Sequence, residues 1–215
     1  MTENITFEEA THTYTVLGSD GKTYTPPSVT TLLARFLEDY KNVPQAILQK
    51  AAAHGTKVHK ALEAVQQGKT PDCSDIDYVA LAVHYYKVMA KAHGIVPILQ
   101  EHKVVYEDNG EPLFVGTLDA LSVVDGVLTL VDFKTTSELH TEALRWQLTA
   151  YKMALEQNIT GLKIKALACI WLPKNGAPRL VLVKMLDEDV VLTTLKKYAA
   201  QTEETEEWME DWDYA

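Results

Sequence analysis

The dipeptide Asp125-Gly126, which lies between the segments SVV and VLT, is the feature that most constrains the fold of this 215-residue chain. Asp-Gly favours a two-residue type I′ turn, because that turn needs a positive φ at both central positions. The turn fixes the register of the two strands that it joins. Counting outward places Asp119 directly opposite Asp132, at a kind of position where Cα atoms approach to about 4.5 Å. The sequence therefore predicts a β-hairpin that holds two carboxylates face to face.

Two facing carboxylates need compensation. Like charges opposite each other destabilise a sheet, and more so beside apolar residues of the same face. Either one aspartate is protonated or a cation bridges the pair, and carboxylate oxygens favour a hard ion such as Mg²⁺ or Mn²⁺. Lys134 lies two residues beyond Asp132 and points to the same face. This pattern predicts a patch of two anionic ligands and one ammonium; the alternative is a Lys134–Asp132 salt bridge on a solvated sheet face.

The first half of the chain predicts a small hairpin followed by helices. Residues 11–25 alternate apolar and polar side chains around a glycine-containing turn, which is typical of a hairpin. Ser28 is a suitable N-cap, because apolar residues follow it at helical spacing. Two longer helices are predicted over residues 44–67 and 75–92.

The second half predicts a sheet. Segments rich in β-branched and aliphatic residues indicate strands over residues 98–106, 113–124, 126–135, 163–172 and 179–186. One helix, over residues 138–157, separates the third strand from the fourth, and a closing helix begins near Asp187. The predicted fold class is therefore α/β, of the α+β type, with a central mixed β-sheet flanked by helices and with the N-terminal hairpin and helices as additions.

We expect one domain over residues 1–200, in which residues 1–95 form the hairpin and helical part and residues 96–200 the sheet core.

The formal charge of -10 is concentrated in a tail over residues 201–215, which holds seven acids and no base; 23 acids and 20 bases remain elsewhere. The charge therefore does not exclude nucleic acid, which usually meets a basic surface. Trp208 and Trp212 in the tail either bind a partner or a basic groove, or pack on the body of a solubilising end.

Composition excludes other classes of protein. No stretch approaches the roughly 18 to 20 apolar residues of a membrane span, and the start MTENITFEEA does not resemble a signal peptide. We therefore expect a cytoplasmic protein with no membrane partner. Cys73 and Cys169 form no CxxC pair, which excludes a zinc knuckle and a four-cysteine iron–sulfur cluster.

The segment HGTKVHKALE supplies a candidate ligand from a helix. His59 and Glu63 are four residues apart and share a helix face, whereas His54 lies on another. His59 is the better candidate for a metal ligand; the alternative is a histidine satisfied by ordinary surface or core contacts.

The helix after the hairpin and the first strand add three further polar candidates. Gln147 and Tyr151 are one turn apart, and Gln147 lies beside an apolar stripe. A buried amide needs partners, so Gln147 either supports the site or makes a core hydrogen bond. Glu101 either reaches the metal site or points to water.

The ordered segments HGTKVH, GTLDAL, LVDFKT and RWQLTAY resemble the PD-(D/E)XK nuclease superfamily, and specifically its RecB-like exonuclease branch. These segments span residues 54–151, and the predicted order of strands and helices fits the restriction-endonuclease-like core of that family. The N-terminal segments HTYTVLG and PPSVTTLL are similar to stand-alone nucleases of this branch that are often found in phages.

The resemblance implies a role for each matching residue. It implies one or two Mg²⁺ or Mn²⁺ ions, bound by His59, Asp119, Asp132 and the backbone carbonyl of Phe133, with Glu101 as a further ligand. It also implies that Lys134 is the catalytic lysine, and that Gln147 and Tyr151 order the site and the nucleic-acid backbone. Many members carry glutamate at the position of Asp132, and some branches have four cysteines for an iron–sulfur cluster, which this chain lacks.

The implied function is metal-dependent hydrolysis of DNA phosphodiester bonds, as an exonuclease in recombination, repair or phage DNA processing. Its partners would be single- or double-stranded DNA ends, and a recombination or helicase protein or further copies of the chain. The candidates for phosphate contacts are the basic residues that flank the motifs: Lys57, Lys60, Arg145 and Lys152. Two alternatives remain: a catalytically silent DNA-binding or scaffold subunit of a recombination complex, and an interaction protein that acts through its acidic tail.

Overall fold

The computed structural model describes residues 4–9, 11–18, 20–37, 44–73 and 77–201. Along the chain, the elements are β1 (Ile5–Glu8), β2 (Thr13–Leu17), β3 (Thr23–Tyr24), α1 (Val29–Ala34), α2 (Gln45–Gln66), α3 (Asp77–Ala92), β4 (Val96–Asp108), β5 (Glu111–Val124), β6 (Val127–Lys134), α4 (Thr141–Asn158), β7 (Ala166–Trp171), β8 (Arg179–Val183) and α5 (Glu188–Ala199). The predicted strands and helices are all present, with ends that differ by a few residues. The acidic tail and its Trp208 and Trp212 lie outside the described residues.

The main sheet has the order β4-β5-β6-β7-β8 among the described residues. Its neighbours are antiparallel except β6 and β7, which run parallel and are connected through α4. The mixed sheet of the predicted fold class is therefore confirmed. Because α4 forms the crossover between two parallel strands, it packs against the sheet beside the end of β6.

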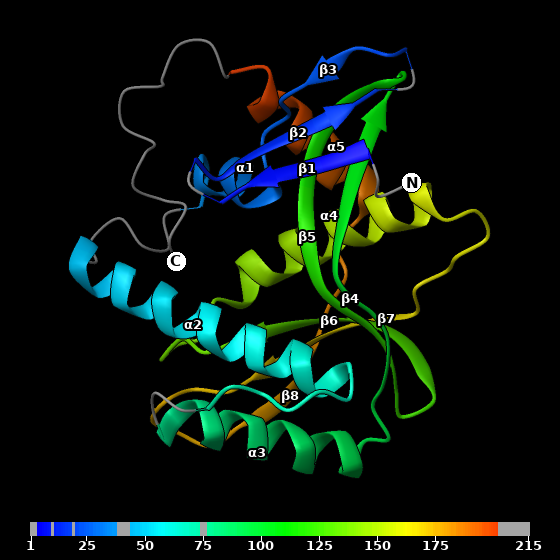
Figure 1. Ribbon diagram of the computed structural model, residues 1–215. Coiled ribbons are helices and arrows are strands. Elements are labelled where there is room, and N and C mark those ends of the chain that lie inside the picture. Colours follow the sequence, from blue (N-terminus) through cyan, green and yellow to red (C-terminus); the bar gives the residue numbers. More distant parts are fainter. Residues whose placement is uncertain (1–3, 10, 19, 38–43, 74–76, 202–215) are drawn as a thin grey trace.

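Helices cover both faces of this sheet. The face that includes Val131 and Phe133 packs against α2 and α3, whereas the face that includes Leu121 and Leu130 packs against α1, α4 and α5. Figure 1 shows α2 and α3 side by side on one side of the strands and α4 on the other. The sheet thus lies in the middle of the molecule, where its strand ends meet helices from both layers.

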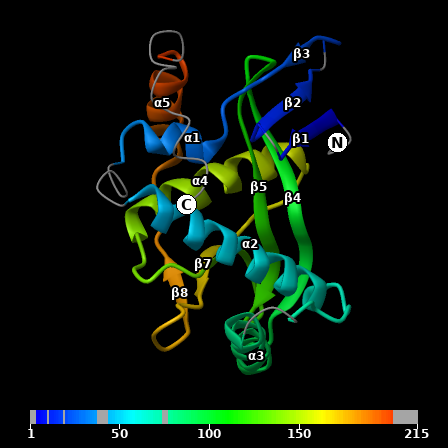
Figure 2. The same ribbon diagram turned by 60° about the vertical axis from the view of Figure 1, so that its left-hand side comes forward.

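A second, smaller sheet has the order β1-β2-β3 in the described part of the chain. The predicted N-terminal hairpin corresponds to β2 and β3, whereas β1 was not expected from the sequence. Figure 2 shows β4 and β5 as a long bent hairpin that extends from α3 to this small sheet. Tyr14 on β2 bonds Thr117 on β5 through their hydroxyls at 3.0 Å, so the small sheet reaches the strand that carries Asp119.

The turn that constrains the fold has the expected geometry. Asp125 has φ 50° and Gly126 has φ 80°, as a type I′ turn requires. The predicted register is confirmed from Val124↔Val127 to Ala120↔Val131. The ladder ends there, so the predicted pairing of Asp119 with Asp132 is not part of it: the two strands separate one step before the aspartates.

Helix ends follow the capping rules. The Ser28 hydroxyl accepts a hydrogen bond from the Thr31 backbone N–H at 3.0 Å, which confirms the predicted N-cap of α1. Asp187 caps α5 in the same way. Within the described residues, no helix is at once long enough and apolar enough to span a bilayer.

Candidate functional site

The Asp119 carboxylate lies at the point where the β5–β6 ladder ends. Its Oδ2 accepts a hydrogen bond from the Phe133 backbone N–H at 2.6 Å. A strand N–H without a ladder partner needs another acceptor, and Asp119 supplies it. The carboxylate is thereby held rigidly at the opening between the two strands.

His59 reaches this opening from α2. Its neighbours Val58 and Leu62 are fully buried against the sheet, which orients the helix so that the imidazole faces β6. The His59 Nε2 lies 3.0 Å from the Phe133 carbonyl oxygen, and its Nδ1 lies 3.4 Å from the Asp119 Oδ1. The His59 imidazole and the Phe133 backbone therefore both lie beside the Asp119 carboxylate.

Glu101 enters the site through an irregularity in β4. The pairs Gln100↔Ala120 and His102↔Leu118 place it opposite Asp119, but its φ of 43° is rare for a residue with a side chain. The ligand atoms of His59, Glu101 and Asp119 all lie within 4.8 Å of one another. Strained backbone of this kind is often found at functional sites.

Asp132 and Lys134 form the other half of the site. Asp132 is buried, and both of its oxygens lie 3.3 Å from the Lys134 Nζ. Its Oδ2 nevertheless has no hydrogen bond. The Lys134 Nζ also lies 3.4 Å from the Gln147 Oε1 of α4. The ion pair with Lys134 therefore leaves the hydrogen-bonding capacity of this buried carboxylate unfilled, which is costly, so this side of Asp132 is suited to a further cation.

Tyr151 contacts Gln147 through a side-chain hydrogen bond. The Tyr151 ring is buried, and its hydroxyl bonds Gln147; burial raises the pKa of the phenol above its ordinary value. A Cβ built on Gly116 of β5 would lie 2.5 Å from this ring, so only glycine lets Tyr151 approach the strand. Sequence reasoning missed Gly116, although a glycine within a strand often marks a close approach.

The charges of the site do not balance. Burial lowers the pKa of His59, but the charge of Asp119 and the bond to it outweigh burial and raise this pKa to about 9. Although Glu101 is open to solvent on one side, desolvation of its carboxyl in the site and the charge of Asp119 raise its pKa to about 7. Burial also raises the pKa of Asp132 to about 6, against the opposing effect of Lys134. Two of the three carboxylates are thus destabilised in their charged form.

The remaining two groups stay charged. Burial raises the pKa of Asp119, but the charge of His59 and the hydrogen bond to it outweigh this effect, so the pKa lies below its ordinary value. Burial lowers the pKa of Lys134, but Asp132 and Asp119 raise it above its ordinary value. Lys134 is therefore an ammonium at neutral pH.

These donors fit a hard divalent cation. The ligand atoms of His59, Glu101 and Asp119 lie within 4.8 Å of one another, close enough for all three to reach one ion. The Phe133 carbonyl oxygen, which is hydrogen-bonded to the His59 ring at 3.0 Å, lies beside them. Oxygen donors with one imidazole suit Mg²⁺ or Mn²⁺ better than a soft metal. Cys169 pairs with Asp132 in the sheet, but burial raises the pKa of its thiol, so it offers no thiolate.

Two of the four basic residues that were candidates for phosphate contacts, Lys152 and Arg145, are paired with acids of the protein. Lys152 is buried and pairs with Glu156 at 3.2 Å and with Glu188. The expectation that Lys152 contacts phosphate is wrong, because both carboxylates hold its ammonium inside the protein. Arg145 pairs with Glu142 and the Lys184 carbonyl. Lys57 and Lys60 line a cavity of about 310 Å³ along α2.

Comparison with known proteins bears on this site. The model of the PD-(D/E)XK nuclease superfamily matches residues 78–214 of the chain. Among solved structures, SSO0001, known from a crystal structure, resembles the chain with 17% sequence identity and a TM-score of 0.47, over 84% of this chain and 78% of that one. No curated protein matches the chain. The family match includes Asp119, Asp132 and Lys134 but begins after the helix that carries His59.

Proposed function

Because the chain belongs to the PD-(D/E)XK nuclease superfamily, we propose that it hydrolyses DNA phosphodiester bonds with one or two divalent metal ions. The proposed ligands are His59, Asp119, Asp132 and the Phe133 carbonyl, with Glu101 as a further ligand. Mg²⁺ or Mn²⁺ is the proposed ion. The observation that carries the proposal is a site with more carboxylates than cations, in which the ligand atoms of His59, Glu101 and Asp119 lie within 4.8 Å of one another and the buried Asp132 Oδ2 has no hydrogen bond.

A divalent ion in such a site lowers the pKa of bound water and polarises the scissile phosphate. The chain supplies the rest of the chemistry. Lys134 is proposed as the catalytic residue that, as an ammonium, stabilises the charge developing on the phosphoryl oxygens and orients the attacking water.

Gln147 and Tyr151 are proposed to position Lys134. The Gln147 carbonyl accepts from the Lys134 ammonium at 3.4 Å, which restricts the directions in which the remaining N–H groups point. Tyr151 fixes Gln147 in turn, because its ring is enclosed by α4 and the Gly116 backbone. This chain of contacts would keep the ammonium aimed at one phosphate oxygen.

We further propose that the activity is exonucleolytic, of the RecB-like type, and acts in recombination, repair or phage DNA processing. The support is the set of segments HGTKVH, GTLDAL, LVDFKT and RWQLTAY. His59, at the end of the first segment, lies against the residues of the third, 3.0 Å from the Phe133 carbonyl.

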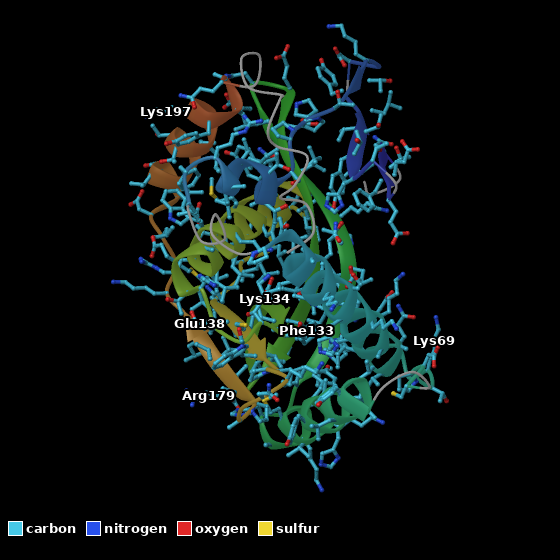
Figure 3. The ribbon with its side chains drawn as sticks, turned by 90° about the vertical axis from the view of Figure 1, so that its left-hand side faces the viewer. Lys69, Phe133, Lys134, Glu138, Arg179 and Lys197 are labelled. Atoms are coloured by element: carbon cyan, nitrogen blue, oxygen red, sulfur yellow. The ribbon has the colours of Figure 1, made fainter. Side chains whose placement is uncertain are left out.

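The test is cleavage of end-labelled linear and covalently closed circular DNA, single- and double-stranded, with Mg²⁺, with Mn²⁺ and with EDTA. Wild type is compared with Lys134→Ala and with Lys69→Ala, which removes an exposed lysine at the end of α2, far from Lys134 in Figure 3. We expect metal-dependent release of short products from linear DNA by wild type and Lys69→Ala, and none by Lys134→Ala. DNA binding without cleavage under every condition would instead support a binding or scaffold subunit, and cleavage of circles would contradict the exonuclease proposal.

A further inference from the structure

Three side chains lie in a row across the main sheet beside the proposed catalytic residue. Lys134 on β6 pairs with Trp171 on β7, and Trp171 pairs with Arg179 on β8. Directly paired residues point to the same face of a sheet. With neighbouring strands 4.7–4.9 Å apart, the row extends about 10 Å from Lys134. It continues from the site along the edge at which β6 and β7 end.

Trp171 and Arg179 form a fixed aromatic and cationic pair. The Arg179 guanidinium lies over the Trp171 ring, 5.8 Å from its centroid. The indole N–H donates to the Thr136 carbonyl at 2.8 Å, which anchors the ring while it stays partly exposed. The Trp171 ring also packs against the hydrophobic core, so only part of the ring, beside the exposed Arg179, is open to solvent.

Arg179 has no carboxylate partner among the residues that the structure describes. Arg145, in contrast, is held by Glu142 at 2.7 Å. An exposed arginine that is not held in an ion pair is available for a phosphate, which it can bind through two N–H groups at once. Figure 3 shows Arg179 on the same side of the molecule as Lys134.

We propose that an unpaired DNA strand lies along this row, with its scissile phosphate beside Lys134, a base stacked at Trp171 and the adjacent phosphate bound by Arg179. The strand is single because stacking on a side chain needs a free base face, which a duplex does not offer. The inference rests on the proposed nuclease function and adds the form of DNA and the residues that bind it. Single-stranded ends are therefore the expected substrate class.

The test measures binding separately from cleavage. A short fluorescein-labelled oligothymidylate is titrated with protein in Ca²⁺ or EDTA, and anisotropy gives the dissociation constant at a series of salt concentrations. The variants are Arg179→Ala, Arg179→Lys and Trp171→Phe. Lys184→Ala is the matched control, because it removes an exposed cation just beyond the other end of β8.

We expect Arg179→Ala to weaken binding at least about 10-fold, the low end for one lost hydrogen bond between charged groups, and to make the salt slope shallower by about 0.7, the value of one single-strand phosphate contact. Arg179→Lys should keep the slope but bind more weakly than wild type, Trp171→Phe should keep most of the affinity, and Lys184→Ala should match wild type. Two outcomes would show that the row is not the binding site, although the nuclease proposal would stand if wild type cleaves DNA. In the first, Arg179→Ala binds the oligonucleotide as tightly as wild type. In the second, Arg179→Ala loses as much affinity for duplex DNA as for the oligonucleotide. If wild type neither binds nor cleaves, both proposals are wrong.

Discussion

Lys134 and Lys152 are two lysines paired with acids in parts of the molecule with opposite characters: Lys134 pairs with Asp132, and Lys152 pairs with Glu156 and Glu188. Around Lys152, every charged group has a partner: Glu156 accepts from Lys152, from Lys163 and from the Ile164 backbone N–H. Around Lys134, the Asp132 Oδ2 has no hydrogen bond, and Glu101 lies within 4.8 Å of the ligand atoms of Asp119 and His59.

The pKa values separate the two regions. Although its burial acts in the opposite direction, hydrogen bonds from Ile164 and Lys152 lower the pKa of Glu156, so its charge stabilises the fold. Burial raises the pKa of Asp132 to about 6 and that of Glu101 to about 7, so their charges oppose the fold. A lysine between acids is therefore structural where the acids are satisfied, and a mark of a functional site where they are not.

The largest difference between variants in the two regions should appear in the rate of DNA cleavage. Asp132→Asn removes one proposed ligand charge, and we expect the rate of DNA cleavage to fall at least about 100-fold, the scale of one lost transition-state contact. Glu156→Gln should leave the rate close to that of wild type, because Glu156 lies in the structural cluster. Single-turnover assays on labelled DNA measure both, and equal losses would remove the distinction between the two regions.

The free energy of unfolding should be affected in the opposite order: more by a change around Lys152 than by a change around Lys134. Lys152→Met leaves Glu156 and Glu188 without their shared ammonium, and we expect the free energy of unfolding to fall by about 1–3 kcal/mol, less than for a fully enclosed pair because Glu188 is half exposed. Asp132→Asn relieves the repulsion between Asp132 and Asp119 but takes the acid partner from Lys134, so we expect a smaller change in the stability of the metal-free protein than for Lys152→Met. Urea denaturation in EDTA gives both values, and a large loss for Asp132→Asn would show that its charge is structural.

The smallest effect concerns pH and has opposite signs in the two regions. The pKa of Glu101 is raised from 4.5 to about 7 in the folded protein, so its ionisation opposes folding; the cost is absent below pH 4.5 and complete above pH 7. Glu101→Gln should therefore raise the melting temperature of the metal-free protein by a few degrees at pH 8.5 and less at pH 5.5.

Glu156→Gln is the matched variant for that experiment. Because the pKa of Glu156 is lowered, its ionisation contributes stability that is present above its unfolded value and is lost as pH falls through the folded one. This variant should lower the melting temperature at pH 8.5. The same sign of change in both variants would contradict the comparison.

The sequence was sufficient where one local signal determines geometry. Asp125-Gly126 determined the hairpin register as far as Ala120↔Val131 and placed Asp119 and Asp132 just past the end of the ladder. Their direct pairing is not formed, because Asp119 accepts from the Phe133 backbone N–H where the strands separate. The acid–lysine pattern and the helical spacing of Gln147 and Tyr151 were then enough to name side chains that the structure places in contact.

Contacts between distant segments could not be predicted in this way. Of the two partners of Lys152, Glu156 lies one helical turn away and could have been found from the sequence, whereas Glu188 lies 36 residues further along the chain, on another helix. The close approach of Tyr151 to Gly116 depends on how α4 packs on β5. Both depend on the position of a helix relative to another element, which periodicity does not determine.

The central claim is that the unbalanced carboxylates around Lys134 bind a divalent cation. Mn²⁺ titration of wild type and Asp132→Asn, followed by the loss of the free Mn²⁺ signal in electron paramagnetic resonance, tests it most directly. We predict saturable binding of one or two Mn²⁺ ions by wild type, competed by Mg²⁺ and strongly weakened in Asp132→Asn but not in Glu156→Gln. Absent binding, or equal binding by wild type and Asp132→Asn, would contradict the assignment of this site as a metal centre.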